Sequence, residues 1–328
     1  FGEPGAEILY PDPGFPIYRS MIEYTGAKPI PVPIREENGF AFSADELLSL
    51  ITDKTRLIIV NSPANPTGGV TPKAEIDKLV AGLARWPDVA IMSDEIYDSQ
   101  VYDGMEHVTL LSYPEIRDRL ILLNGWSKTY AMTGWRIGYV AGPRPYIKAL
   151  DTLLSQSTGN ACTVSQAAAA AAMNGDQSFV TQSVAVYKQR RDQSIAALNA
   201  IPGISCRTPE GAFYLYVNCG GLIGRRTPEG KVLETDADVV MYLLESEGVA
   251  VVAGTAYGLS PYFRMSIATS LDILDEGCKR IARAVRDFGG QVVRELLEQL
   301  VVQAQFGLPS GFVDVGDGVE LLCAEAQT

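Results

Sequence analysis

Three stretches of strand length, each with an apolar run at its centre or start, constrain the fold of this chain more than any other feature. They read TRLIIVNSP, with the run LIIV, VAIMSDEIY, with the run VAIM, and RLILLNGWSK, with the run LILL. Strands that are apolar along their whole length fit a sheet that is covered on both faces, as parallel sheets are. The helical pattern TPKAEIDKLVAGLARW separates the first two stretches, with Thr71 expected as its N-cap and Pro72 in its first turn. This alternation predicts an α/β fold, in which a mostly parallel sheet carries helices on both faces.

The segments on either side extend the pattern. AEILYP is predicted to be a short strand, and SADELLSLIT a helix that begins with a capping box formed by Ser43 and Glu46. WRIGYVAG follows the third apolar stretch after too few residues for a helical crossover. We therefore expect WRIGYVAG to run antiparallel to its neighbour.

The chain is long enough for two unequal domains, because its 328 residues exceed an ordinary single domain. A long amphipathic helix is expected over residues 177–200, and a mixture of strands and helices follows it. We expect a large domain over residues 1–180, a smaller α+β domain over 181–288 and an atypical tail over 289–328. The elements expected in the smaller domain are GAFYLYV, TDADVVMYLLESEG, GVAVVAG, YFRMSIAT and a helix near residues 271–288.

The tail has a pattern of its own. QVVRELLEQLVVQAQ is expected to be helical, and FVDVGDGVELL is expected to form a hairpin around Asp317 and Gly318. Neither segment continues the alternation of the large domain.

Composition disfavours several classes of function. The formal net charge of −12 and the pI of about 4.7 argue against nucleic acid or an anionic membrane as a partner. No apolar run is long enough to span a bilayer. The five cysteines are scattered without metal-site spacing, which indicates reduced thiols in a cytoplasmic protein. The single histidine, His107, is expected to be a solvated loop residue, and one histidine disfavours zinc sites and Ser-His-Asp hydrolysis.

Polar side chains follow the apolar stretches at the edge where the predicted parallel strands end. Open α/β sheets bind ligands beyond the carboxyl ends of their strands, so we expect these side chains to meet. They are Phe15 and Tyr18 after AEILYP, Asn61 and Asn65 after the first stretch, Asp94 and Tyr97 after the second, and Ser127 and Lys128 after the third, with Arg136 further along.

Several of these side chains suit the ring of a phosphorylated pyridine aldehyde. A pyridine nitrogen stays protonated beside a fixed anion, which Asp94 would supply. A phenolate oxygen on the ring requires hydrogen-bond donors, which Asn65 and Tyr97 would supply. Phe15 offers an aromatic face on which the ring would stack.

The remaining polar groups suit the substituents of such a ring. The amine of Lys128 would form an imine with the aldehyde. The hydroxyl of Ser127 and the guanidinium of Arg136 would hold the phosphate. Together the set predicts a site in which the protein binds and tunes a cofactor that acts as the electron sink.

Five segments, taken in order, resemble the consecutive motifs of the class I aminotransferases, the fold-type I family of aspartate aminotransferase and above all its bacterial branch. They are NSPANPTGG, SDEIYDSQVYDG, NGWSKTYAMTGWRIGYVAG, GAFYLY and FRMSIATS. Each motif alone is weak, since Asn-Pro and Gly occur in most turns, but the ordered set is specific. The resemblance spans residues 6–288 and implies a fold-type I architecture with pyridoxal 5'-phosphate as cofactor. It also implies amino transfer from an L-amino acid to a 2-oxo acid through a lysine aldimine.

The resemblance also assigns roles. It implies that Lys128 forms the internal aldimine and moves the proton, that Asp94 pairs with the pyridine nitrogen, and that Tyr97 and Asn65 contact the ring oxygen. Arg264, in FRMS, would bind the α-carboxylate of the substrate through its planar fork, beside Asn65. Phe15 would stack on the ring, and Ser127 and Arg136 would hold the phosphate.

The resemblance also implies an assembly. The family's sites lie at a dimer interface, and the small-residue helix SQAAAAAAM suggests close packing, so we expect a homodimer.

The family pattern includes roughly a hundred residues that precede the position of Phe1, with a loop that cradles the phosphate at a helix N-terminus.

Three readings stay open: an aminotransferase, a non-transaminating enzyme on the same scaffold such as a β-lyase or a cyclopropane-forming synthase, and an inactive remnant or binding module. A dehydrogenase is disfavoured because no G-x-G-x-x-G follows the first strand.

Overall fold

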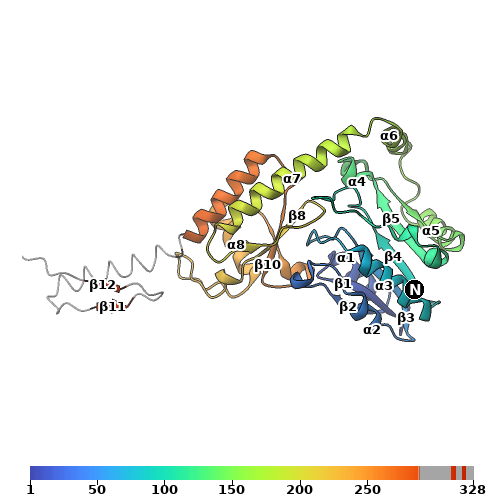
Figure 1. Cartoon of the computed structure of the whole chain (residues 1–328), viewed down its shortest axis with the longest axis horizontal. Coiled ribbons are helices and arrows are strands. Elements are labelled where there is room, and N and C mark those ends of the chain that lie inside the picture. The colour runs from blue at the N-terminus through green and yellow to red at the C-terminus, as the bar shows by residue number, and fades with distance from the viewer. Residues whose placement is uncertain (287, 289–311, 315–319, 323–328) are drawn as a thin grey trace, which may run out of the picture.

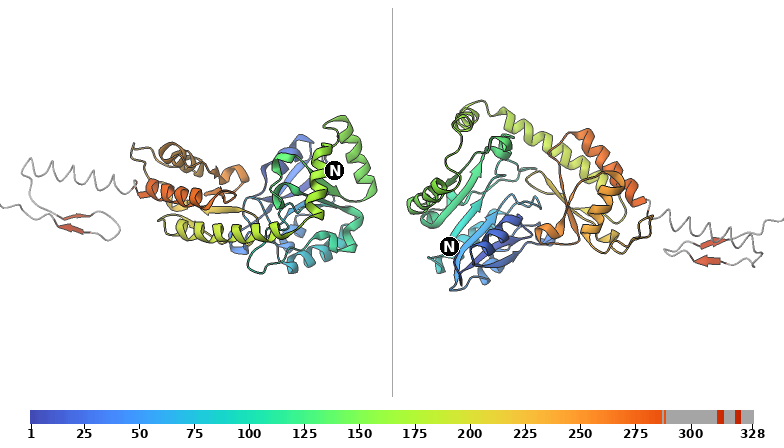
Figure 2. Two further views of the ribbon diagram at one scale, coloured as in Figure 1. Left: turned by 90° about the horizontal axis from the view of Figure 1, so that it is seen from above. Right: turned by 180° about the vertical axis from the view of Figure 1, so that it is seen from behind.

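Residues 1–286 fold into two bodies, each built on its own sheet. The computed structural model describes residues 1–286, 288, 312–314 and 320–322. The helix α7 (Ser178–Asn199) runs from one body to the other (Figures 1 and 2).

The larger sheet has six strands in the order β2-β1-β3-β4-β5-β6. All neighbouring pairs are parallel except β5 and β6, which are antiparallel. The predicted α/β class and the predicted antiparallel strand after the third apolar stretch are thereby confirmed. The strands are β1 (Glu7–Asp12), β2 (Lys28–Pro33), β3 (Thr55–Asn61), β4 (Ala90–Asp94), β5 (Leu120–Gly125) and β6 (Gly138–Ala141).

Helices cover both faces of the parallel strands, as the apolar runs require. On one face, Ile58 and Ile91 pack with side chains of α2 and α3. On the other face, Leu57 and Ile59 pack with Tyr18 of α1. Alternate residues of one strand thus enter two different cores, which explains why residues 57–60 of β3 are all apolar. The helices of this body are α1 (Pro16–Tyr24), α2 (Ala44–Ser49), α3 (Lys73–Gly82), α4 (Trp126–Thr129), α5 (Arg144–Gln156) and α6 (Thr163–Asn174).

Two helix starts differ from the predicted caps. Ser43 caps α2 by accepting from the Glu46 N–H at 3.4 Å, but the Glu46 carboxylate binds the guanidinium of Arg35 instead of completing the box. The prediction of Thr71 as the cap of α3 is wrong, because α3 begins at Lys73 and Pro72 occupies the cap position. The N–H of Thr71 donates to Ser62 Oγ at 2.9 Å, which holds this residue in the preceding loop.

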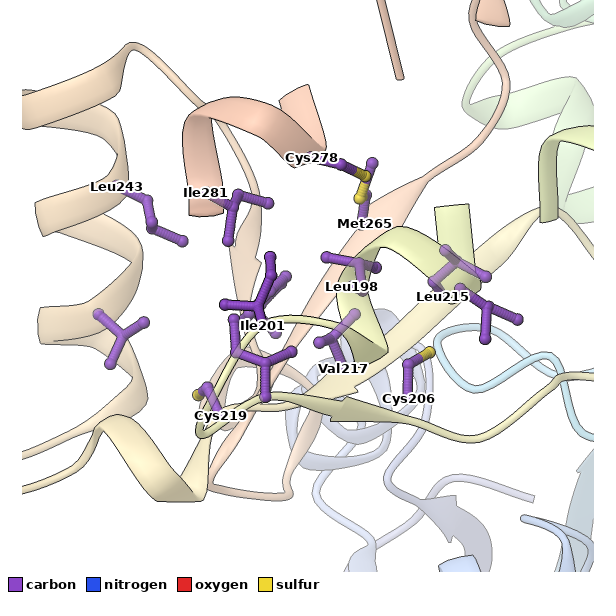
Figure 3. Close-up of a cluster of buried hydrophobic side chains, with 14 of the residues drawn as sticks. Leu198, Ile201, Cys206, Leu215, Val217, Cys219, Leu243, Met265, Cys278 and Ile281 are labelled. Atoms are coloured by element: carbon purple, nitrogen blue, oxygen red, sulfur yellow. The ribbon is translucent and has the colours of Figure 1, made fainter. Parts of the chain in front are cut away.

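The smaller sheet is antiparallel, with strands in the order β7-β8-β10-β9. Its core gathers side chains from α7, β8, α8 and the helix of residues 271–286 (Figure 3). Leu198, Val217 and Ile281 in this core are fully buried, and each stabilises the fold by about 1.5–3 kcal/mol. The elements are β7 (Ser205–Cys206), β8 (Tyr214–Asn218), α8 (Asp236–Glu247), β9 (Val252–Ala253) and β10 (Tyr262–Ser266).

The predicted domain limits relate to these elements in different ways. The expected boundary between residues 180 and 181 falls inside α7 and stays a prediction. In the tail, β11 (Phe312–Asp314) pairs antiparallel with β12 (Glu320–Leu322), as a hairpin requires. The hairpin turn expected at Asp317 and Gly318, and the helix expected over residues 291–305, lie outside the described residues.

Candidate active site

The carboxyl ends of β3, β4 and β5 meet at one edge of the large sheet. Asn61 pairs in register with Asp94, so the loops after β3 and β4 start at the same level. The Asn61 amide then joins the two loops, since its Nδ2 donates to the Asp94 carbonyl at 2.9 Å and its Oδ1 accepts from the Asn65 N–H at 3.0 Å. This arrangement fixes Asn65 beside the end of β4.

A cavity of about 910 Å³ opens at this edge, and we call it the strand-end cavity. One wall is apolar and includes Leu150 and Leu154 of α5. Tyr18 and Tyr214 also line the cavity. Most of the predicted site residues line it together, namely Phe15, Asn65, Asp94, Tyr97, Lys128 and Arg264.

Lys128 lies in α4, the short helix that follows β5. Its Nζ lies 5.9 Å from the ring centroid of Tyr97 and 5.6 Å from that of Phe213. Within the described residues, this Nζ has no hydrogen bond or ion pair. Burial and the nearby charge of Arg264 lower the pKa of Lys128, although Asp94 opposes the shift. A lysine with a depressed pKa has more neutral amine at a given pH, and the neutral amine is the nucleophile.

Asp94 is held by Tyr18, whose hydroxyl donates to Asp94 Oδ2 at 2.5 Å. The N–H of Ile96 donates to the other carboxylate oxygen at 3.3 Å. Burial raises the pKa of Asp94, and the hydrogen bond from Tyr18 opposes that shift. A carboxylate in such a position would favour a cation placed against it. We did not predict this role of Tyr18, although its place three residues after Phe15, in a helix that begins with Pro16, was a possible signal.

Arg264 reaches the cavity from β10 of the smaller sheet. Its Nη1 donates to Asn65 Oδ1 at 2.9 Å, and its guanidinium carbon lies 4.4 Å from the ring centroid of Tyr214 and 4.9 Å from that of Tyr257. Its Nε is buried and has no hydrogen-bond partner among the described residues. A buried donor without a partner is costly, so this guanidinium is arranged to receive an acceptor such as a carboxylate.

Tyr97 follows β4 and is buried. Its hydroxyl lies 2.9 Å from the hydroxyl of Tyr214, and its ring makes an edge contact with Phe213. Burial first, and then the Tyr214 hydroxyl and the Asp94 carboxylate, raise the pKa of Tyr97 far above its ordinary value. Tyr97 therefore stays protonated and retains one hydrogen to donate.

Phe15 sits at the start of α1, with its ring edge-on to Tyr18 at a centroid distance of 5.7 Å. Its side chain is exposed and lines the strand-end cavity, so an aromatic ligand there would cover it.

Ser127 and Arg136, the two residues predicted to bind phosphate, are not among those that line the strand-end cavity. Arg136 lines a neighbouring cavity of about 970 Å³, and Gly138 and Leu154 line both. The backbone of Arg136 is left-handed, with φ of 54°, and its Nη1 donates to the Thr133 carbonyl at 3.2 Å. Arg136 thus lies beside the strand-end cavity and not in its wall, and Ser127 lines neither of these two cavities.

His107 differs from the prediction of a solvated loop residue, which is wrong. Its Nε2 lies 2.9 Å from a carboxylate oxygen of Glu95, and its side chain is only 12% exposed. Glu95, next to Asp94 in the chain, also accepts from Ser93 Oγ at 2.8 Å and from the Leu110 N–H at 3.0 Å. The single histidine therefore holds Glu95, the first residue of the loop after β4. No local pattern in the sequence could indicate that His107 pairs with Glu95.

Two searches of the described residues bear on other kinds of function. In that part of the chain, no cluster of histidine, cysteine and carboxylate side chains could hold a metal ion. Nor does a helix there combine the length and the apolar character needed to cross a membrane.

Comparison with known proteins points to one family. The family model described as aminotransferase class I and II matches residues 1–281. The chain is 44% identical over 283 residues to an aspartate aminotransferase of Rhizobium meliloti (strain 1021), covering 86% of the chain and 69% of that protein. It is 45% identical over 281 residues to a probable aspartate/prephenate aminotransferase of Rhizobium leguminosarum bv. phaseoli, covering 85% of the chain and 70% of that protein.

A solved structure agrees with the sequence matches. The crystal structure of the aspartate aminotransferase from Rhizobium meliloti superposes with a TM-score of 0.83 at 43% identity. The match covers 87% of this chain and 72% of that one. The residues matched by the family model, 1–281, include both sheets and every residue that lines the strand-end cavity.

Proposed function

Because this chain belongs to the aminotransferase class I and II family, we propose that it holds pyridoxal 5'-phosphate in the strand-end cavity and transfers amino groups there. The family membership establishes the class of reaction, which passes an amino group from an amino acid to a 2-oxo acid. The cofactor and the role of each residue are our proposals.

One observation carries the proposal. Lys128, Asp94 and Arg264 line a single cavity although they come from three separate elements: the helix α4, strand β4 of the large sheet and strand β10 of the smaller one. The amine of Lys128, with its lowered pKa, suits an aldehyde, and the carboxylate of Asp94, held by Tyr18, suits a pyridinium. The guanidinium of Arg264, whose buried Nε has no hydrogen-bond partner in the described part of the chain, suits a carboxylate.

The described residues fit the cofactor ring. Asp94 would bind the pyridine nitrogen, and Tyr18 would keep the carboxylate in place. Because Arg264 occupies Oδ1 of Asn65, the amide nitrogen of Asn65 remains a donor for the ring oxygen. Tyr97 would donate to the same oxygen.

The phosphate would lie where the strand-end cavity borders its neighbour, near Ser127 and Arg136. Arg136 is close enough for its charge to contribute to the lowered pKa of Lys128. The shared lining residues Gly138 and Leu154 connect the two spaces. The guanidinium of Arg136 in the neighbouring cavity, with the hydroxyl of Ser127 next to Lys128 in the chain, would suit a phosphate dianion.

The residues of the chain would then act in turn on the amino acid. When bound, pyridoxal 5'-phosphate withdraws electrons from the α-carbon of the substrate. Arg264 would bind the α-carboxylate through two parallel hydrogen bonds and so orient the Cα–H bond. The neutral amine of Lys128 would take the proton from that carbon and deliver it to the carbon that had been the aldehyde of the cofactor.

The names of the relatives suggest the donor to test first. The relatives named above are called aspartate or aspartate/prephenate aminotransferases, so we infer that aspartate is a donor. The test is a panel of acidic, aromatic and aliphatic amino acids, each mixed with the cofactor-loaded chain in the absence of a 2-oxo acid.

An aminotransferase converts its bound cofactor from the aldehyde form to the amine form with a suitable donor. Conversion with aspartate supports the proposal. A β-lyase would release a product without that conversion, and a binding module would show no change with any donor. Failure with every donor would overturn the proposed reaction of this chain.

We also propose that two copies associate. The small-residue helix α6 buries only Ser165 and Ala169 within the chain, and it leaves Val164 and Met173 exposed. Leu153 of α5 is likewise exposed, at 65%. An apolar surface of this kind suits a second copy of the chain. Light scattering on the purified protein would show a dimeric mass, whereas a monomeric mass with full cofactor occupancy would refute it.

A further inference from the structure

Tyr214 contacts two of the candidate site residues, Tyr97 and Arg264. It begins β8 and is 7% exposed. Its hydroxyl lies 2.9 Å from that of Tyr97, and its ring centroid lies 4.4 Å from the guanidinium carbon of Arg264. One side chain therefore touches the tyrosine beside the cofactor position and the arginine beside the substrate position.

We propose that Tyr214 is a positioning residue, whose hydroxyl directs the proton of Tyr97 and whose ring holds the guanidinium of Arg264. The inference rests on the proposed function, because it assigns Tyr97 to the ring oxygen of the cofactor and Arg264 to the substrate carboxylate. It adds a residue of the cavity lining that acts on both groups through Tyr97 and Arg264.

The direction of the hydrogen bond follows from counting protons. Each tyrosine hydroxyl has one hydrogen, and burial keeps Tyr97 protonated. If Tyr97 donates its hydrogen to the cofactor oxygen, the bond between the two hydroxyls must run from Tyr214 to Tyr97. A hydroxyl that accepts a hydrogen bond is a stronger donor, because neighbouring bonds polarise one another. Tyr214 would therefore strengthen the bond from Tyr97 and stabilise the ionised ring oxygen.

The ring of Tyr214 has a separate task. Its face attracts the guanidinium of Arg264, and Tyr257 adds a second contact at 4.9 Å. Arg264 in turn holds Asn65 by its Nη1. The hydroxyl and the ring thus affect different measurable quantities: the first affects the cofactor chromophore, and the second affects substrate binding.

A purely structural role is the alternative, since Tyr214 also belongs to the core of the smaller body. Such a role would change stability alone. It would leave the absorbance of the bound cofactor and the KM values for amino donors as they are in the wild type.

Three variants of the full chain, loaded with pyridoxal 5'-phosphate, separate these roles. Tyr214→Phe removes the hydroxyl and keeps the ring, and Tyr214→Leu removes both. Tyr242→Phe is the control, because the Tyr242 hydroxyl is also buried and donates to the Ala284 carbonyl at 3.4 Å in the core of the smaller body. Each variant is titrated with pH while the absorbance of the lysine-linked cofactor is followed, and KM is then measured for three donors.

In Tyr214→Phe, the pKa read from the absorbance of the lysine-linked cofactor should rise by about half a unit to one unit. This is the shift expected for the loss of one neutral hydrogen bond. KM should stay within about twofold, because the ring still faces Arg264. Tyr214→Leu should show the same rise in pKa together with a KM about three- to tenfold higher for every donor. The control should match the wild type in both measurements.

Each other outcome is decisive. A wild-type pKa in Tyr214→Phe, or the same shift in Tyr242→Phe, overturns the role of the hydroxyl. A wild-type KM in Tyr214→Leu overturns the role of the ring. A wild-type chain that forms no lysine-linked chromophore refutes the proposed function itself, and it is thereby distinguished from a failure confined to Tyr214.

Discussion

Replacing Arg264 by lysine tests the proposal that Arg264 binds the α-carboxylate of the substrate. Lysine keeps the charge but loses the fork, the hydrogen bond from Nη1 to Asn65 at 2.9 Å, and the guanidinium carbon that lies 4.4 Å from the ring centroid of Tyr214. The α-carboxylate is common to all amino acids, so the loss should not depend on the side chain of the donor. We expect KM to rise and kcat to fall together, because binding and orientation are both affected.

The structure sets the magnitude of this loss. A hydrogen bond to a charged group contributes about 1.5–3 kcal/mol, and Arg264→Lys removes one arm of a bidentate pair as well as the support of Asn65. A total of about 2–3 kcal/mol corresponds to a fall in kcat/KM of about 30- to 150-fold. Steady-state kinetics with an acidic, an aromatic and an aliphatic donor measures it.

A matched control is available on the surface. Arg283 pairs with Glu247 at 2.8 Å, and its side chain is 44% exposed. Arg283→Lys should therefore change stability by only about 0–1 kcal/mol and leave the kinetics unaltered. If Arg264→Lys behaves like this control, Arg264 lies outside the reaction. If its effect is confined to acidic donors, it reads the donor side chain and not the α-carboxylate.

Three further perturbations follow from the same geometry. Asp94→Ala should lower kcat by at least about 10²-fold, since the anion beside the pyridine nitrogen is lost, and turnover near the wild-type level would make this carboxylate structural. Tyr18→Phe removes the 2.5 Å bond to Asp94 and should lower kcat less than Asp94→Ala does while leaving KM nearly unchanged; an effect on KM alone would contradict it. Burial opposes ionisation of Glu95, but hydrogen bonds from His107 and others outweigh it and hold the pKa of Glu95 below its ordinary value of 4.5. Ionised Glu95 therefore stabilises the folded state at pH values above 4.5, and this stabilisation is lost as the pH falls through the pKa of Glu95 in the folded state. The urea midpoint of the wild type should thus fall with decreasing pH more steeply than that of Glu95→Gln. Equal slopes would refute this.

The sheet could be predicted because its causes are local in the sequence. Strands such as β3 are apolar on both faces, and the short connection before β6 leaves only an antiparallel return. The positions of Asn65, Asp94 and Lys128 followed from the rule that ligands bind at the carboxyl ends of such strands.

Contacts between distant segments could not be predicted in this way. Tyr97 and Tyr214 are 117 positions apart, and Asn65 and Arg264 are 199 positions apart. No periodicity within one segment encodes such a contact, because it depends on how the two sheets pack. The pairing of His107 with Glu95 was missed for the same reason, since a histidine in a polar segment resembles a solvated one until the loop closes over β4.

The covalent attachment of the cofactor tests the central claim most directly. The chain is loaded with pyridoxal 5'-phosphate, reduced with borohydride, digested and analysed by mass spectrometry. Lys148→Ala is the control for Lys128→Ala, because Lys148 is an exposed lysine of α5. We predict that the reduced cofactor is found on Lys128 in the wild type and in Lys148→Ala, and that Lys128→Ala carries none. A reduced, lysine-linked cofactor that persists in Lys128→Ala would contradict the account.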